Sequence, residues 1–259
     1  MIDTVLLPSV RERFPPTHAV LLDNLEAIIS ALEKNSQLTS LLDLTERGVF
    51  LFNSYVAFAV AVYTAKFRQL YEALADSLNQ SWYLTYAQSG RSILENAATV
   101  RHYSRHGDFV ALRDAQRKGP PPTTVLEKAI TTVDRFIRGN RFTWQAFVSK
   151  KFDELSNVAD DPEMAQVNVQ TCLSSWYKGS PQIKGLYDLL CDLVHPNLGS
   201  NLTVIRTYDG KLAACGDKGE EMTMFVIAPT LAGLVGAYRV VQESLLAIER
   251  LKVAENNHS

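Results

Sequence analysis

Apolar residues recur three or four positions apart along most of this chain, the spacing that places them on one face of an α-helix. The clearest example is residues 19–32, which form a single amphipathic pattern. The same period predicts helices over about 81–106 and 230–253, and another from about residue 38 or 49 to residue 78. The pattern therefore predicts a mainly α-helical bundle that ends in a long C-terminal helix.

Prolines interrupt the helical pattern near the middle of the chain. Residues 119–122 are Gly-Pro-Pro-Pro, and successive prolines remove amide donors and hold the chain extended, so we predict a linker or a sharp elbow there. A Thr-x-x-Glu capping pattern at 124–127 predicts that a helix follows at once and ends near 139–140. Proline marks two later helix starts, Asp161 before Pro162 and Ser180 before Pro181, and the second of these helices is predicted to stop at Pro196.

The pattern changes again over residues 202–216, which have Asp-Gly near their centre. Asp-Gly readily supplies the positive φ angles of a type I′ turn, so this segment is predicted to be a β-hairpin. Residues 222–227 could add a strand. Because the chain has no internal repeat, we predict one helical domain over 1–259, with the hairpin inserted before the C-terminal helix.

One uncharged run is long enough to be considered as a membrane span. Residues 48–65 are eighteen positions without a charge, beginning at Gly48, a possible helix break, and this length just reaches that of a membrane span. Polar residues such as Asn53 and Thr64 interrupt the run, and several of its apolar residues are alanines. We therefore favour a buried central helix, or a helix at a homodimer interface, and expect no membrane partner.

Composition and cysteine usage indicate an intracellular globular protein. Of 259 residues, 46% are apolar and 21% are charged. A chain of this length and apolar content can bury a continuous core. Cys172, Cys191 and Cys215 lie far apart without a Cys-x-x-Cys spacing, which excludes a cysteine zinc knuckle and gives no disulfide framework. The charged N-terminus is not typical of a signal peptide. A cytoplasmic location is predicted.

Positive charge gathers in one part of the chain. Residues 101–151 hold eleven Lys or Arg against four Asp or Glu, a net charge of +7, whereas the remainder of the chain carries −9. Aromatic residues are interleaved with these cations. The asymmetry favours an anionic partner, such as RNA or a nucleotide, that binds this region. The alternative is a set of solvated helix faces with core aromatics behind them.

Two polar clusters stand out within otherwise apolar helical segments: Arg91-Ser92-Ile93-Leu94-Glu95, and residues 190–197 with Asp192 and His195. A charge among core residues is costly unless it is paired. Arg91 and Glu95 have the spacing of a simple i,i+4 ion pair. Asp192 could fix the tautomer of His195, and the end of a helix favours an imidazolium, so His195 is either a general acid or base or only a structural cap.

A metal site is a weaker interpretation of the same residues. His102 and His106 have i,i+4 spacing, and on a continuous helix both share a face with Arg91 and Glu95. The Asp-x-x-His element that ends at His195 is similar to one found in helical-bundle metal proteins. The chain lacks His-Glu-x-x-His and a second acidic-x-x-His copy. We therefore predict no metal and no cofactor.

The order of two motifs resembles a bacterial helical family of unknown function. The motifs are Arg-Ser-x-x-Glu at 91–95 and Tyr-Asp-x-Leu-x-x-x-Val-His-Pro-Asn at 187–197, and the resemblance covers about residues 49–200. That family is distantly similar to HEPN domains (higher eukaryote and prokaryote nucleotide-binding), many of which are dimeric ribonucleases of toxin and phage-defence systems. Their catalytic helix has an arginine four to six residues before the histidine. Here that helix has none, so the resemblance implies that Arg91 acts from the other helix.

The sequence leads to two hypotheses of different classes. The first is a cytoplasmic HEPN-like domain that binds, and could cleave without metal, RNA or a nucleotide: Arg91 holds phosphate, Glu95 and Asp192 orient partners, and His195 exchanges protons. This hypothesis predicts that Arg91 or Glu95 lies within a few ångströms of the turn at 192–195. The second is a non-catalytic helical module, binding a ligand or a protein, in which the same residues form a buried network. A catalytic His195 should be exposed, whereas a structural network should bury it.

Overall fold

The computed structural model of this protein describes residues 5–37, 40–138, 144, 148–150, 167–196, 198–214 and 226–254. Within them, the elements follow in the order α1 (Pro8–Arg13), the 3-10 helix η1 (Pro16–His18), α2 (Ala19–Ser36), α3 (Gly48–Asn79), α4 (Tyr83–Ser104), α5 (Gly107–Gln116), α6 (Thr123–Arg138), α8 (Val169–Tyr177), α9 (Pro181–Val194), α10 (Leu198–Asn201), β1 (Ile205–Tyr208), β2 (Lys211–Ala214) and α12 (Ala228–Glu249). The predicted mainly α-helical fold, with a β-hairpin before a long final helix, is confirmed.

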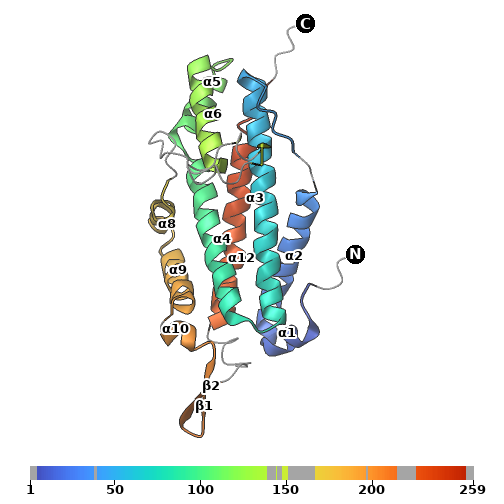
Figure 1. The fold of residues 1–259 in the computed structure, drawn as a ribbon, viewed down its shortest axis with the longest axis vertical. Helices are drawn as coiled ribbons and strands as arrows, with labels where there is room; N and C mark the ends of the chain where they lie inside the picture. Colours follow the sequence, from blue (N-terminus) through green and yellow to red (C-terminus); the bar gives the residue numbers. More distant parts are fainter. Residues whose placement is uncertain are drawn as a thin grey trace.

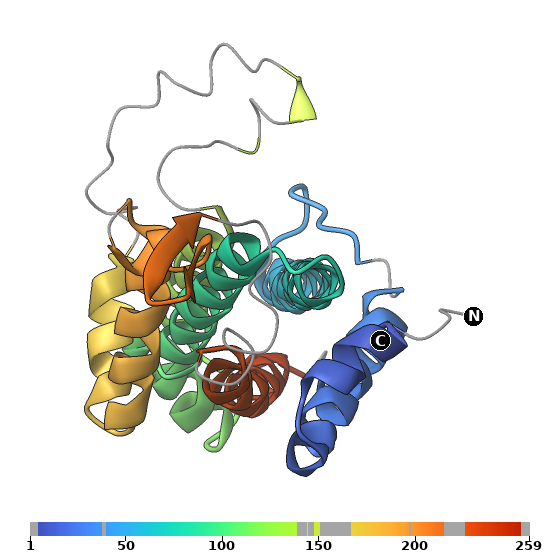
Figure 2. The same ribbon diagram turned by 90° about the horizontal axis from the view of Figure 1, so that it is seen from below.

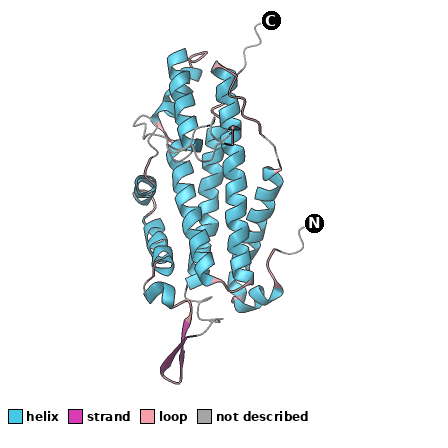
Figure 3. Ribbon diagram, viewed as in Figure 1, coloured by secondary structure: helices cyan, strands magenta, loops and turns pink. Residues whose placement is uncertain are grey.

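Three long helices, α3, α4 and α12, run side by side and form the centre of the bundle (Figure 1). Helix α2 packs on α3 and α12 at one side, and α8 and α9 pack on α4 at the other (Figure 2). Helices α5 and α6 lie at one end of the bundle, and α10 and the hairpin lie at the other (Figure 3). Buried apolar side chains from all the long helices belong to one continuous core.

Buried tyrosines connect the three central helices. The Tyr71 hydroxyl of α3 donates to the carbonyl of Leu234 at 2.8 Å, and the Tyr86 hydroxyl of α4 lies 3.0 Å from the Thr230 hydroxyl. A buried phenol without a partner would cost about 1 to 3 kcal/mol. These two bonds therefore fix the position of α12 against both of its neighbours.

Two glycines allow α9 to approach the central helices closely. A Cβ atom at Gly90 would lie 2.9 Å from Leu234 Cδ1 and 3.3 Å from Leu190 Cδ2, and one at Gly233 would lie 2.5 Å from Leu186 Cδ2. Separations this short are below normal van der Waals contact, so a side chain at either position would push α9 away. Gly90 therefore sets the distance between α9 and α4, on which the candidate site depends, and Gly233 sets the distance between α9 and α12.

The helix predicted over 81–106 ends two residues early. Helix α4 stops at Ser104, and the backbone of His106 is extended, with φ −61° and ψ 144°. Its Nδ1 accepts a hydrogen bond from the backbone N–H of Asp108 at 3.3 Å, so His106 caps the start of α5. The proline-rich elbow lies between α5 and α6, as predicted, but α6 begins at Thr123, so Thr124 is inside the helix and does not cap it.

The hairpin forms as predicted. Strands β1 and β2 pair antiparallel, and the turn residues Asp209 and Gly210 have φ angles of 48° and 70°, the positive values that a type I′ turn needs. A further strand was suggested at residues 222–227, but residues 222–225 lie outside the described part of the chain. Val226 and Ile227 are helical and lead into α12.

Helices α3 and α12 are both long and apolar enough to span a membrane, by length and composition alone. The most apolar stretch of 18 residues in α3 has a mean hydropathy of 1.6, and 33% of it is buried within the bundle. The corresponding stretch of α12 has a mean hydropathy of 1.3 and is 44% buried. Both helices contribute to the core, which is consistent with a soluble protein. The burial predicted for the uncharged run of α3 is thus only partial.

Candidate functional site

Arg91 and Glu95 of α4 meet Tyr187 of α9. Arg91 Nε donates to Glu95 Oε1 at 2.8 Å, and the Tyr187 hydroxyl donates to the same oxygen, also at 2.8 Å. The Arg91 guanidinium lies over the Tyr187 ring, with Cζ 5.8 Å from the centroid. One carboxylate oxygen thus joins both helices and accepts two hydrogen bonds, one of them from a cation.

The network continues to α8. Gln170 Nε2 donates to the Tyr187 hydroxyl at 3.2 Å, so this phenol both accepts and donates. Burial and the hydrogen bond to Glu95 raise the pKa of Tyr187, and burial together with the charge of Asp188 raises the pKa of Tyr177 to about 12. Both phenols are therefore neutral at physiological pH. Tyr187 therefore donates a hydrogen bond to the Glu95 carboxylate at neutral pH.

The Arg91 side chain is held at one edge only. Its Nε is bound to Glu95, while Nη1 and Nη2 have no hydrogen-bond or ion-pair partner among the residues that the structure describes. The side chain is 30% exposed, and that of Glu95 is 25% exposed. The hydrogen bond to Glu95 raises the pKa of Arg91, so the guanidinium stays charged. Its two terminal amino groups are therefore oriented but open, and an anion could accept from both.

Asp192 and His195 are not part of this network. Both are exposed, and neither side chain has a hydrogen-bond or ion-pair partner in the described ranges. The backbone N–H of His195 donates to the Cys191 carbonyl at 2.9 Å, and its extended ψ of 146° ends α9. Arg91 and Glu95 thus reach the helix that carries His195, but they contact it at Tyr187, two turns earlier.

Helix geometry explains why Tyr187 contacts α4 and Asp192 does not. Glu95 contacts Tyr187, whereas Gly90, nearer the start of α4, faces Leu190, so the two helices run antiparallel. At about 100° per residue, position 192 lies roughly 140° around α9 from position 187 and faces away from α4. Tyr187 could not be recognised as a site residue from the sequence, because an aromatic residue on an apolar helix face is typical of a core. Its place in the Tyr-Asp-x-Leu motif was the available signal.

The histidines proposed as metal ligands lie near each other but have other partners. The rings of His102 and His106 are 6.4 Å apart between centroids. Burial and, to a lesser extent, the neighbouring His106 and Arg101 lower the pKa of His102, and His106 Nδ1 lies 3.4 Å from an Asp108 carboxylate oxygen. Within the described residues, no three His, Cys, Asp or Glu side chains gather closely enough to hold a metal ion.

The basic region lies mostly at the other end of the bundle. Helices α5 and α6 are at the opposite end from the end of α9 (Figure 1). Part of the positive charge is neutralised locally, because Arg138 pairs with Asp134 at 2.8 Å. Arg101 is half-buried, and burial and the neighbouring Arg105 lower its pKa. Arg101 is ten residues along α4 from Arg91, about 15 Å, so a ligand would have to be extended to reach both.

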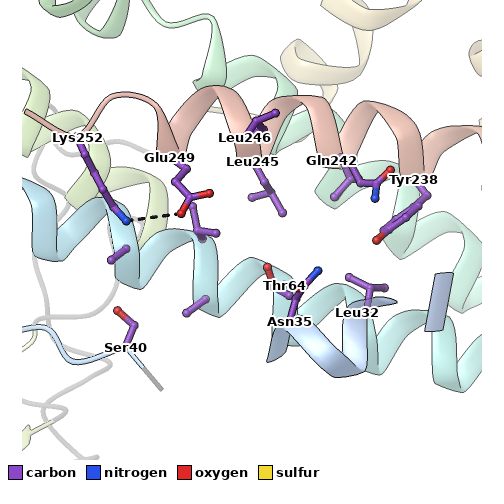
Figure 4. A pocket seen from close by; sticks show the side chains of 14 residues that line it. Leu32, Asn35, Ser40, Thr64, Tyr238, Gln242, Leu245, Leu246, Glu249 and Lys252 are labelled. Atoms are coloured by element: carbon purple, nitrogen blue, oxygen red, sulfur yellow. Dashed lines mark ion pairs between the residues drawn. The ribbon is translucent and has the colours of Figure 1, made fainter. Parts of the chain in front are cut away.

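A separate groove lies between α3 and α12 (Figure 4). It forms because α2 ends at Ser36, while α3 and α12 continue and leave an open seam of about 540 Å³. Apolar residues such as Leu245 and Leu246 line its middle. Polar side chains lie at both ends: Asn35, Thr64, Tyr238 and Gln242 at one, and Ser40, Glu249 and Lys252 at the other. The Lys252 ammonium is 3.6 Å from the Glu249 carboxylate, a loose and exposed pair.

No family model, no curated protein and no solved structure matches this chain. The two features that carry chemical information are the open Arg91 guanidinium with its supporting network, and the exposed His195 on the adjoining helix.

Proposed function

We propose that this protein is a HEPN-like domain that binds RNA or a nucleotide through its phosphate groups, with Arg91 as the principal phosphate ligand. The observation that carries the proposal is the half-buried Arg91, which is fixed through Nε by Glu95 and has both terminal amino groups open. A guanidinium held in this way matches the oxygens of a phosphate bidentately and loses little conformational entropy on binding. The resemblance of the two motifs to HEPN-related proteins supports the same function.

All of these polar residues except Asp192 then have a defined role. Glu95 and Tyr187 orient Arg91, since both bind the same network. His195, which is exposed on the same helix as Tyr187, is the group that exchanges protons with the ligand. Asp192 faces away from Arg91 and has no contact with His195 among the described residues, so we give it no role.

The proposal extends to metal-independent cleavage of RNA. His195 takes the proton from a ribose 2′-hydroxyl as that oxygen bonds to the adjacent phosphorus, and the bond to the 5′ oxygen breaks as this oxygen gains a proton from water. Arg91 stabilises the negative charge that develops on the phosphate oxygens.

We further propose that the protein acts in the cytoplasm as a homodimer, for which exposed apolar side chains such as Phe50 and Leu246 offer contact area.

The test is a binding titration with fluorescently labelled RNA and, in parallel, a labelled nucleotide. Arg91→Ala should weaken binding of whichever ligand binds by roughly ten-fold or more, because a hydrogen-bonded charge pair contributes about 1.5 to 3 kcal/mol. Arg91→Lys should restore only part of the affinity, since an ammonium lacks the planar fork. Lys184→Ala is the matched control, because Lys184 is exposed on the outer side of α9 and already pairs with Asp188. Failure of the wild-type protein to bind either ligand would refute the proposal.

A second function is favoured by the groove in Figure 4: a helical module that binds a small, neutral, elongated molecule. The volume of about 540 Å³ lies within the roughly 300 to 1,000 Å³ typical of small-molecule sites, and polar groups at both ends of an apolar seam are what such a ligand needs. Saturable stabilisation of the protein by a long-chain alcohol, lost when Ala61 is replaced by Phe to fill the groove, would favour this function. A thermal shift that persists in Ala61→Phe would exclude the groove as the site.

A further inference from the structure

The hairpin projects beyond the end of the bundle at which α9 and α10 also end (Figure 1). Its four residue pairs, from Ile205 with Ala214 to Tyr208 with Lys211, form the only ladder among the described residues. An isolated two-stranded hairpin is at best marginally stable in water. A hairpin that extends into solvent without a packing partner in the described chain is therefore more useful as a contact surface than as part of the core.

The register divides the hairpin into two chemically different faces. Side chains alternate between faces along a strand, and directly paired residues share a face. One face therefore carries Arg206, Tyr208 and Lys211. The opposite face carries Ile205 and Leu212, together with their cross-strand partners Ala214 and Thr207.

Tyr208 lies between the two cations. Lys211 is its cross-strand partner, about 5 Å away between Cβ atoms, and Arg206 is two residues earlier on the same strand, about 7 Å away. All three residues are exposed, Tyr208 by 65%, and within the described chain none of their side chains has a hydrogen bond, an ion pair or a cation–π contact. The ring and both charges are therefore available to a ligand.

We propose that this face of the hairpin binds single-stranded RNA, with Tyr208 stacking on an unpaired base while Arg206 and Lys211 contact the phosphates on either side. This inference rests on the proposed RNA-binding function and names the form of RNA that the site takes. An exposed aromatic ring flanked by cations is the arrangement by which proteins hold single strands, because every base offers a stacking face and the backbone is anionic. In a duplex the base faces are covered by their neighbours, so the ring has nothing to stack on.

Its position connects the hairpin with Arg91 and His195. The first residue of β1 follows His195 by ten positions, and only the single turn of α10 lies between them. The hairpin and the end of α9 are therefore at the same end of the molecule (Figure 1). A strand that stacks on Tyr208 is thereby directed toward the end of α9, whereas most of the basic region lies at the far end of the bundle.

The experiment compares binding of labelled oligouridine with binding of an RNA duplex of equal length to the full chain. Tyr208→Ala should weaken oligouridine binding by roughly ten-fold, since stacking contributes about 1 to 3 kcal/mol per base, and Tyr208→Phe should leave it unchanged. Arg206→Ala with Lys211→Ala should lower the slope of log affinity against log salt by about 1.4, the value for two phosphate contacts on a single strand. Leu212→Ala on the other face, where the side chain is 78% exposed, is the matched control and should bind as the wild type does.

Three results would overturn the inference. One is equal binding of oligouridine by the wild type, Tyr208→Ala and the double variant. Another is a preference of the wild type for the duplex, and the third is an equal loss in Leu212→Ala and Tyr208→Ala, which would assign the hairpin to a protein partner. Arg91→Ala separates this inference from the proposed function: if only Arg91→Ala loses binding, the hairpin inference fails alone. If only the hairpin variants lose binding, the inference stands and the phosphate role of Arg91 fails.

Discussion

Tyr187 and His195 belong to the same motif on α9, yet their surroundings differ. Tyr187 is buried, binds Glu95 and Gln170, and fixes α9 against α4 and α8. His195, eight residues later, is exposed and has no side-chain partner among the described residues. The comparison teaches that the motif combines two functions: its buried half positions the helix and orients Arg91, while its exposed half leaves an ionisable group free for a ligand.

The largest effect expected in the buried half comes from Glu95→Ala. This change leaves the half-buried Arg91 charge and the Tyr187 hydroxyl without their common acceptor, so it should lower the free energy of unfolding by about 2 to 3 kcal/mol. Arg239 and Glu243 form an i,i+4 pair of the same type on α12, but it is largely exposed. Glu243→Ala should therefore cost only a small fraction of that value in urea unfolding. Equal losses in the two variants would mean that Glu95 forms an ordinary surface pair.

A smaller effect is expected from Tyr187→Phe. The ring remains and continues to fill its place, but the hydrogen bonds to Glu95 and from Gln170 are lost, which should reduce stability by about 1 to 2 kcal/mol. The exposed Tyr208 supplies the control, because Tyr208→Phe removes a hydroxyl with no partner in the described chain and should not change the unfolding curve. A Tyr187→Phe protein as stable as the wild type would show that the phenol does not hold the two helices together.

The long helices could be predicted from the sequence because their apolar period persists over many turns. The helix predicted over 19–32 matches α2, and the Asp-Gly turn located the hairpin. Helix α5 was missed, since it has only ten residues and gives fewer than three turns of pattern. The helix start predicted at Asp161 and Pro162 lies outside the described residues, and the described helix α8 begins at Val169. The end of α4 was misplaced because His106 caps the next helix with its own side chain, a choice that periodicity does not reveal.

The candidate site could be predicted only in part. The i,i+4 spacing of Arg91 and Glu95 is a property of one helix, so their pairing follows from the sequence. The partner that they share depends on how α9 is placed against α4 and α12, where Gly90 and Gly233 make close contacts with it. No pattern within one helix contains that information. For the same reason the spacing within α9 favours pairing Asp192 with His195 and gives no sign of the contact between Tyr187 and Glu95.

The smallest effect on stability, and the most direct test of the proposed function, is expected from His195→Ala. Thermal melts of this variant should be run beside an RNA binding and degradation assay, with Glu95→Ala measured in the same way. We predict that His195→Ala melts within about 1 °C of the wild type, because an exposed imidazole makes few packing contacts, but loses activity toward RNA. A drop in melting temperature as large as that of Glu95→Ala, with RNA activity unchanged, would contradict the account and show that His195 belongs to the structural network.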